Sequence, residues 1–328
     1  MNAKLFFTPG ADFPVALAPM AGVTDAAFRG ICRGMGADFS YTEMVSAKGL
    51  HYNNANTGAL LAPAPEERVY GAQLFGSDPA VVAEAVEGLL AGNRSGLALI
   101  DINMGCPAHK IVSNGEGSAL MKNIPLAARV TEAAVRAANG RIPVSVKFRK
   151  GWDAQHINAV AFARAAQDAG ASLLAVHGRT REQMYSGRAD WDIIAEVKAA
   201  VTIPVLGNGD VFTGADALAI KAQTGCDGVL VARGAQGNPF LFREIKAALS
   251  GAPYDPPTPG ERIDTALLHA RRLCKTRGDR AVVEMRKHAA WYLAGLRGSA
   301  SLRGRVNAVC SLAELEALLT DYKARFHG

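Results

Sequence analysis

The feature that most restricts the fold of this 328-residue chain is a regular alternation of two kinds of segment. Between residues 15 and 235, short apolar runs alternate with longer, alanine-rich segments of helical spacing. We expect eight strands separated by helices over about 220 residues, the pattern of a (β/α)8 TIM barrel. A doubly wound sheet is the alternative, but no Gly-x-Gly-x-x-Gly turn opens a helix after the first strand. The expected strands are 15–18, 39–42, 69–74, 97–102, 144–148, 173–176, 205–206 and 228–231, and the expected helices include 79–91, 125–139, 154–169, 191–200 and 214–223.

Nearly every predicted strand finishes in a hydrogen-bonding or turn-forming residue. The active site of a TIM barrel gathers side chains from the C-terminal ends of several strands. A full circuit of such residues therefore predicts a single pocket at that end of the barrel. Its expected members are residues 19–22, Glu43, Gln73, Asn103, Lys147, His177, residues 208–210 and residues 233–234.

One of these strand ends leads into a loop with a single cysteine. Gly105 and Pro107 bracket Cys106 and turn the backbone around it, just past the predicted strand at 97–102. A thiol in that position is placed for chemistry. A free cysteine also commonly serves as a small buried apolar side chain, and its spacing alone leaves both readings open.

The last two predicted strands are followed by glycine-containing loops, at residues 205–210 and 229–234. These are the usual phosphate-binding loops of the barrel, where free backbone N–H groups and Arg233 can hold a phosphate. Lys147 points inward in the alternation of its strand, and an inward lysine needs an anionic partner such as the edge of a reduced flavin. The alternatives are glycines that serve only the turns, an exposed Lys147, and a His177 that only satisfies a loop carbonyl.

The pattern changes after residue 240. Residues 250–260 are rich in proline and glycine and predict a linker, and helical spacing follows at 261–277, 279–294 and 312–326. We expect a barrel domain at 1–245 and a linker with a small helical domain at 246–328. Residues 241–328 hold 15 of the 36 Lys and Arg but only 9 of the 30 Asp and Glu, so the net charge of +6 lies there. Basic residues near Trp291 and Tyr292 suit RNA, although both aromatics also suit a core.

Cysteine usage and hydropathy indicate the compartment. The five cysteines form no Cys-x-x-Cys pair and stand in no His-rich spacing, so we expect neither a disulfide framework nor a metal site. The first seven residues contain one positive charge and too short an apolar run for a signal peptide, and no stretch approaches the roughly 18 apolar residues of a membrane span. We expect a soluble cytoplasmic protein with no membrane contact and no obligate protein partner.

Several motifs together resemble the bacterial tRNA-dihydrouridine synthases, most closely their B-type subfamily. The resemblance runs from about residue 15 to the C-terminal helices, and the motifs are specific in combination. They are residues 18–25 (APMAGVTD), 101–107 (DINMGCP), 177–180 (HGRT), 208–210 (NGD), 233–237 (RGAQG), and 286–288 (RKH) with 291–292 (WY).

The resemblance implies an FMN-binding barrel, NADPH as electron donor, and a helical domain that embraces tRNA. Cys106 matches the family's catalytic cysteine, and the implied substrate contacts are Asn103, Arg179, Arg286, Lys287 and His288. The family commonly has a glycine at the position of Ala232, whose N–H remains usable if its φ is negative. The implied FMN contacts are Pro19, Met20, Ala21, Gln73, Lys147, His177, Asn208, Gly209, Asp210, Ala232 and Arg233.

The chemistry implied by the resemblance is reduction of the C5=C6 bond of uridine. Hydride passes from flavin N5 to C6, and the resulting enolate takes a proton at C5 from the Cys106 thiol, whose ordinary pKa is near 8.5. The B-type likeness favours position 17 of the tRNA D-loop. Two alternatives stay open: a flavin-dependent dehydrogenase of a free dihydropyrimidine, and a non-catalytic RNA-binding module on a barrel.

Overall fold

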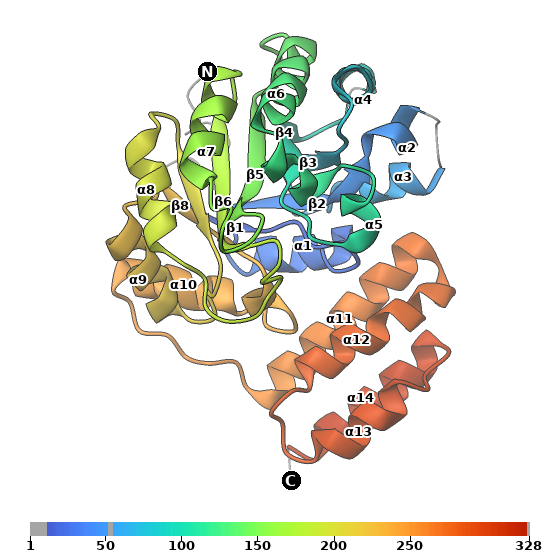
Figure 1. The fold of residues 1–328 in the computed structure, drawn as a ribbon. Helices are drawn as coiled ribbons and strands as arrows, with labels where there is room; N and C mark the ends of the chain where they lie inside the picture. The colour runs from blue at the N-terminus through green and yellow to red at the C-terminus, as the bar shows by residue number, and fades with distance from the viewer. Residues whose placement is uncertain (1–11, 52–54, 93, 327–328) are drawn as a thin grey trace.

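A computed structural model describes residues 12–51, 55–92 and 94–326, and in it eight parallel strands close into a barrel. Each strand pairs with the next in sequence, and β8 returns to pair with β1. The predicted TIM barrel is confirmed (Figure 1). The strands are β1 Val15–Leu17, β2 Phe39–Ser46, β3 Tyr70–Phe75, β4 Leu97–Met104, β5 Val144–Gly151, β6 Leu173–Thr180, β7 Val205–Asn208 and β8 Gly228–Val231.

Helices surround the barrel between successive strands. In the longer ones an alanine-rich inner face packs on the strands, which buries both sides of the sheet. The helices are α1 Ala26–Gly34, α2 Ala47–His51, α3 Ala55–Leu60, α4 Pro79–Ala91, α5 His109–Val112, α6 Ile124–Ala138, α7 Ala159–Asp168, α8 Asp192–Ala200, α9 Gly214–Thr224 and α10 Leu241–Ser250, with short 3₁₀ segments η2 Gly117–Lys122 and η3 Arg233–Ala235.

Helix ends follow local capping chemistry where the sequence supplies it. Asp78 accepts hydrogen bonds from the N–H groups of Ala80 (2.9 Å) and Val81 (3.4 Å) and fixes the start of α4. The helix predicted at 154–169 begins only at residue 159, because Asp153 accepts from the N–H groups of Gln155 and His156 and holds a turn there.

Several strands run further than the apolar pattern predicts. β2, β4, β5 and β6 each have eight residues, so several polar residues expected beyond the strands lie inside them. Asn103, for example, still pairs with Lys147 across β4 and β5. Ladder hydrogen bonds depend on the backbone and not on side-chain polarity, and therefore the polar ends of the strands remain paired.

The interior of the barrel is filled in layers. A cluster of apolar side chains, which includes Phe39, Tyr41, Leu99 and Leu206, closes the barrel below its C-terminal end. The polar groups at that end therefore stand on a packed floor.

The chain then forms a group of helices beside the barrel, here called the helical group: α11 Pro259–Arg277, η4 Asp279–Ala281, α12 Val282–Tyr292, α13 Ser299–Val306 and α14 Leu312–Ala324. It has a hydrophobic core of its own and packs against α1 (Figure 1). Residues 259 and 260, predicted as linker, belong to α11, because Thr258 caps the helix and Pro259 suits its first turn. No helix in the described residues is long and apolar enough to cross a membrane.

Candidate active site at the C-terminal end of the barrel

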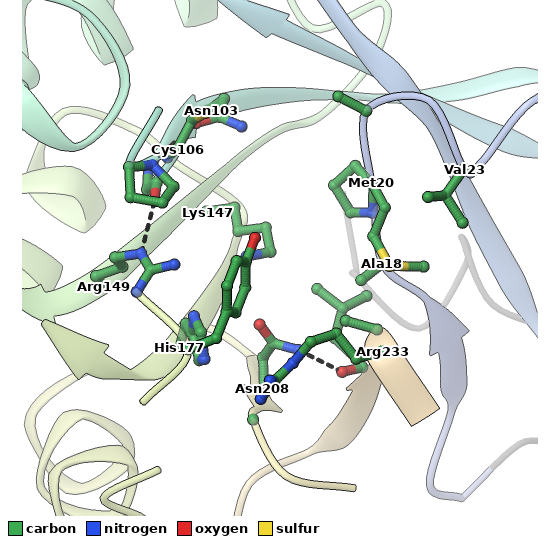
Figure 2. A pocket seen from close by; sticks show the side chains of 18 of the residues that line it. Ala18, Met20, Val23, Asn103, Cys106, Lys147, Arg149, His177, Asn208 and Arg233 are labelled. Carbon is green, nitrogen blue, oxygen red and sulfur yellow. Dashed lines mark hydrogen bonds between the residues drawn. The ribbon is translucent and has the colours of Figure 1, made fainter. Parts of the chain in front are cut away.

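A cavity of about 540 Å³ lies at the C-terminal end of the barrel, within the size range of small-molecule sites. Figure 2 shows Asn103 and Cys106 on one side of it and Ala18 and Met20 on the other. The predicted residues that line the cavity are Pro19, Met20, Ala21, Gln73, Asn103, Cys106, Lys147, His177, Asn208, Gly209, Asp210, Ala232 and Arg233.

Hydrogen bonds hold the Cys106 loop in place at both ends. The Asn103 side-chain oxygen accepts from the N–H groups of Gly105 (3.1 Å) and Cys106 (2.9 Å). Arg149 donates from Nε to the Gly105 carbonyl at 2.8 Å, and Ser118 donates to the Cys106 carbonyl through its N–H (3.0 Å) and hydroxyl (2.9 Å). The thiol is therefore held at the edge of the cavity by a fixed loop.

The environment of Cys106 favours the thiol over the thiolate. Burial raises the pKa of Cys106 above its ordinary value, although the Ala108 N–H and the charges of Arg149 and Lys147 oppose the shift. The group is therefore protonated at neutral pH. It can serve as a proton donor and is poorly suited to act as a base or nucleophile.

A hydrogen-bonded chain of polar side chains lies below the loop. Asn103 donates to Gln73 Oε1 at 2.8 Å, and Gln73 donates to Asp101 Oδ2 at 2.6 Å. Ser145 donates to the other carboxylate oxygen of Asp101. Burial raises the pKa of Asp101 to about 6, while the bonds from Gln73 and Ser145 and the nearby Lys147 oppose the shift. These hydrogen bonds fix the orientation of the Gln73 and Asn103 carboxamides, which face the cavity.

Lys147 lies half-buried on the cavity wall, between the thiol side and the basic side of the pocket (Figure 2). Burial and the neighbouring Arg149 lower its pKa to about 8, while Asp101 and Cys106 oppose the shift. The ammonium is still charged at neutral pH and stands in a cavity wall. This is the inward orientation that the alternation of its strand predicts.

The lower end of the cavity is strongly basic. His177 is buried, and burial together with Arg149, Lys147, Arg179 and Arg233 holds its pKa well below the ordinary value. The neutral imidazole can donate one hydrogen bond without adding charge. Lys147, Arg149 and Arg233 line the cavity around it, and Asp210 pairs with Arg233, so this end can hold an anion such as a phosphate.

The loop after β7 approaches this basic end closely. Gly209 has φ +123°, and a Cβ there would lie 2.6 Å from the Ala189 side chain and 3.1 Å from the His177 ring. Asn208 donates to the Leu230 carbonyl at 2.6 Å and ties β7 to β8. Ala232, at the position where glycine was expected, has a negative φ of −115° and a ψ of −103°, outside the helical and extended regions.

Asp210 links the basic residues to one another. Its carboxylate accepts from Arg179 Nη2 at 2.7 Å and from Arg233 Nη2 at 3.2 Å, and its φ of +55° places it in a left-handed turn. Arg179 is 1% exposed, does not line the cavity, and also donates to the carbonyls of Ser186 and Gly187. The structure thus places Arg179 behind the cavity wall, as a support for Asp210.

Some residues of the cavity wall were not predicted from the sequence. Arg149 lies two positions after Lys147, so the same alternation that selects Lys147 could have found it. Tyr185 (52% exposed) and Phe212 (46% exposed) also line the cavity, and the Arg233 guanidinium lies 4.8 Å and 5.7 Å from their ring centres. Both aromatics stand in irregular loops, where no periodicity marks them.

Glu43 is absent from the cavity lining, contrary to the prediction from its position near a strand end. Its carboxylate accepts from the Gly22 N–H and pairs with Arg277 of α11 at 3.3 Å. The unsatisfied N–H of a tight turn and a guanidinium from the helical group attract the carboxylate away from the pocket. Glu43 therefore joins the barrel to the helical group.

The three residues predicted in the 286–288 motif lie in different environments. Lys287 is exposed, and its ammonium lies 3.1 Å from the position of a Cβ built on Gly22, beside the loop that lines the cavity. Arg286 donates twice to the Val309 carbonyl within the helical group. His288 is 1% exposed and packs against barrel residues. Tyr292 is fully buried, as its alternative interpretation anticipated.

Comparisons with known proteins agree on one family. A family model described as dihydrouridine synthase (Dus) matches residues 16–326. The tRNA-dihydrouridine synthase B of Pseudomonas aeruginosa is 41% identical over 293 residues, covering 89% of this chain and 87% of that protein. A probable tRNA-dihydrouridine synthase 1 of Synechocystis is 41% identical, covering 93% and 85%. A probable tRNA-dihydrouridine synthase of Mycobacterium tuberculosis is 42% identical, covering 93% and 81%.

A comparison with solved structures agrees on the fold. The structure of histamine dehydrogenase from Rhizobium sp. 4-9 matches with a TM-score of 0.52 and 14% sequence identity. The match covers 84% of this chain and 49% of that one, so this chain spans about half the length of that enzyme. At this identity the likeness supports the barrel architecture and nothing more.

Proposed function

This chain belongs to the dihydrouridine synthase family, and from that premise we propose that it reduces uridines of the tRNA D-loop to 5,6-dihydrouridine with bound FMN and NADPH as electron donor. The observation that supports the proposal most strongly is the Cys106 thiol, kept protonated and held by a fixed loop at the edge of a cavity whose other end is lined by Arg149, His177 and Arg233.

The residues present fit an FMN. A phosphate would find Arg233, the neutral His177 and the tight Gly209 turn at the basic end, where the buried Arg179 Nη1 has no hydrogen-bond partner among the described residues. Lys147 would hold the electronegative edge of the ring system, and Gln73, Pro19, Met20 and Ala21 would line its remaining contacts. When bound and reduced, the flavin supplies a hydride to C6 of the target uracil.

Cys106 then supplies the proton that completes reduction of the C5=C6 bond. Addition of hydride at C6 leaves the enolate of the C4 carbonyl, which requires a proton at C5. The Cys106 thiol gives up that proton, and the charges of Lys147 and Arg149 stabilise the thiolate that remains. Asn103 holds the donor at a fixed position through the N–H groups of Gly105 and Cys106.

The helical group supplies the surface for tRNA. It adjoins the cavity mouth through Lys287, beside the loop that lines the pocket, and through Arg277 on Glu43. A polyanionic backbone lying across both parts of the molecule would bring a flipped uracil to the Cys106 loop. The exposed basic side chains from residue 259 to residue 326 are Arg271, Lys275, Arg280, Lys287, Arg297, Arg305 and Arg325.

The experiment that tests this proposal begins with the absorption spectrum of the purified protein and identification of any cofactor released on denaturation. FMN is expected. The protein is then incubated with tRNA from a strain lacking dihydrouridine and with NADPH or NADH, and dihydrouridine is mapped along the tRNA. Activity on intact tRNA but not on free uracil supports the proposal, whereas the reverse supports the free-dihydropyrimidine enzyme. A colourless protein that FMN does not reconstitute and that forms no dihydrouridine would overturn it.

A further inference from the structure

The junction between the barrel and the helical group buries three side chains that the proposed reaction does not use. Asp25 stands at the N-terminus of α1, His269 lies in α11 and His288 lies in α12. They are 4%, 0% and 1% exposed, and one potential ligand atom of each lies within 4.8 Å of the others. A carboxylate and two imidazoles from two parts of the chain therefore meet in the interior.

Their hydrogen bonding leaves donor atoms unused. The Nδ1 atoms of His269 and His288 have no hydrogen-bond partner in the described part of the chain, and His269 Nε2 has only an ion-pair contact of 3.5 Å with Asp25 Oδ2. Buried polar atoms without partners cost free energy, and native proteins contain few of them. One nitrogen of each histidine, together with the Asp25 carboxylate, faces the cluster, and these three atoms point to a shared ligand.

His288 and Asp25 each make one further hydrogen bond that orients the side chain. The His288 ring forms a hydrogen bond with the backbone of Gly22. Asp25 Oδ1 accepts a hydrogen bond from the Phe28 N–H at 3.1 Å. A ligating histidine generally bonds its second ring nitrogen to a carbonyl or carboxylate, which orients the ring. One atom of each side chain remains directed at the cluster.

The spacing and charge also suit a metal. Asp25 Oδ2 lies 3.5 Å from His269 Nε2, and two ligands of a tetrahedral zinc at about 2.0–2.1 Å are themselves roughly 3.3 Å apart. The carboxylate supplies a negative charge, and a carboxylate with two imidazoles is a ligand set that zinc takes in proteins.

We infer that Asp25, His269 and His288 bind one divalent first-row metal ion, of which Zn²⁺ is the best fit, with water in the fourth position. The ion joins the helical group to the turn after β1, because Gly22 in that turn bonds to His288 and neighbouring Ala21 lines the cavity. The site is structural: its ligands are buried and none of them lines the cavity.

The test measures metal content and thermal stability of the full-length flavin-loaded protein. Protein from zinc-supplemented medium is dialysed against a weak chelator and analysed for all first-row metals. We expect about one equivalent per chain. Stripping it with a strong chelator should lower Tm by about 5 °C or more, and added Zn²⁺ should restore Tm.

Variants assign the ion to this cluster. His269→Gln and His288→Gln should each reduce the metal content at least tenfold, whereas His156→Gln, whose side chain is 71% exposed on the barrel, should keep it. If a variant does not fold, the chelation and restoration of the unaltered protein still decide the matter. The inference is overturned if that protein holds less than a tenth of an equivalent and Zn²⁺ leaves its Tm unchanged, or if both folded variants retain the ion.

Discussion

The cavity of the barrel and the junction with the helical group both bury polar side chains, but the hydrogen bonding of these side chains differs between the two regions. At the cavity wall, Gln73, Asp101 and Asn103 satisfy one another, and Gln73 and Asn103 also face space for a ligand. At the junction, two imidazoles lie in a packed interior with unpaired nitrogens. The first arrangement suits a large ligand that enters and leaves, and the second suits a small ion that stays.

The two regions also arise differently. Every group in the cavity wall stands on a strand or in the loop that follows it, and the closed barrel fixes its position. The junction depends on the docking of a separate hydrophobic core, which the ion pairs of Arg272 with Glu66 and of Arg277 with Glu43 accompany. Changes in the cavity should therefore alter chemistry and cofactor, and changes at the junction should alter assembly and tRNA binding.

The largest expected effect is on the proton donor. Cys106→Ala should lower the rate of dihydrouridine formation by about 10²–10⁴-fold, the usual contribution of a positioned general acid. Bound FMN and thermal stability should be nearly unchanged, because the loop is held by backbone bonds. Cys310→Ala, which removes an exposed thiol from the helical group, is the control and should retain full activity. A Cys106→Ala protein with undiminished turnover would remove the thiol from the mechanism.

The second effect concerns the tight turn at the basic end. Gly209→Ala should weaken FMN binding by about tenfold or more and lower the unfolding free energy by about 1–3 kcal/mol. The new methyl group meets Ala189 and His177 at an unfavourable φ. Flavin titration and urea unfolding measure both quantities. Gly225→Ala, also at positive φ but in open space, should cost only the backbone strain and leave FMN binding intact.

The third effect is a pH dependence of stability from Asp101. Its pKa is raised by burial to about 6 in the folded protein, so its contribution to stability is present at low pH and is lost as the pH rises through 6. Lowering the pH from 7 to 5 should therefore stabilise the unaltered protein by roughly 1 kcal/mol relative to Asp101→Asn. Urea unfolding at pH 5, 6 and 7 checks this, and parallel curves for the two proteins would contradict it.

The smallest effect is expected on the exposed side of the junction. Lys287→Ala should raise the KM for tRNA by a fewfold at low salt. The slope of log K for tRNA binding against log salt concentration should become shallower by about one, since about one counterion fewer is released. FMN content and kcat should not change, because Lys287 lies beside the Gly22 turn and not in the cavity lining. Lys221→Ala, exposed on α9 of the barrel, is the matched control. Equal losses in both variants would argue for non-specific charge attraction.

Much of the fold could be predicted from the sequence because the information is local and repeated. Apolar runs and alanine-rich segments recur with fixed periods, so all eight strands could be predicted without tertiary information. The positions of Cys106, Lys147 and His177 then follow, since the C-terminal ends of parallel strands must converge on one end of a closed barrel.

The tertiary structure decided which polar residues face the cavity and which lie elsewhere. Glu43 and Arg179 carry the same sequence signal as their neighbours, yet a distant guanidinium and a distant carboxylate draw them out of the pocket. His288 reads as part of a basic, RNA-facing motif, but it meets Asp25 and His269, which stand 263 and 19 positions away. No period or spacing encodes such a meeting, because it depends on how two independently packed cores dock.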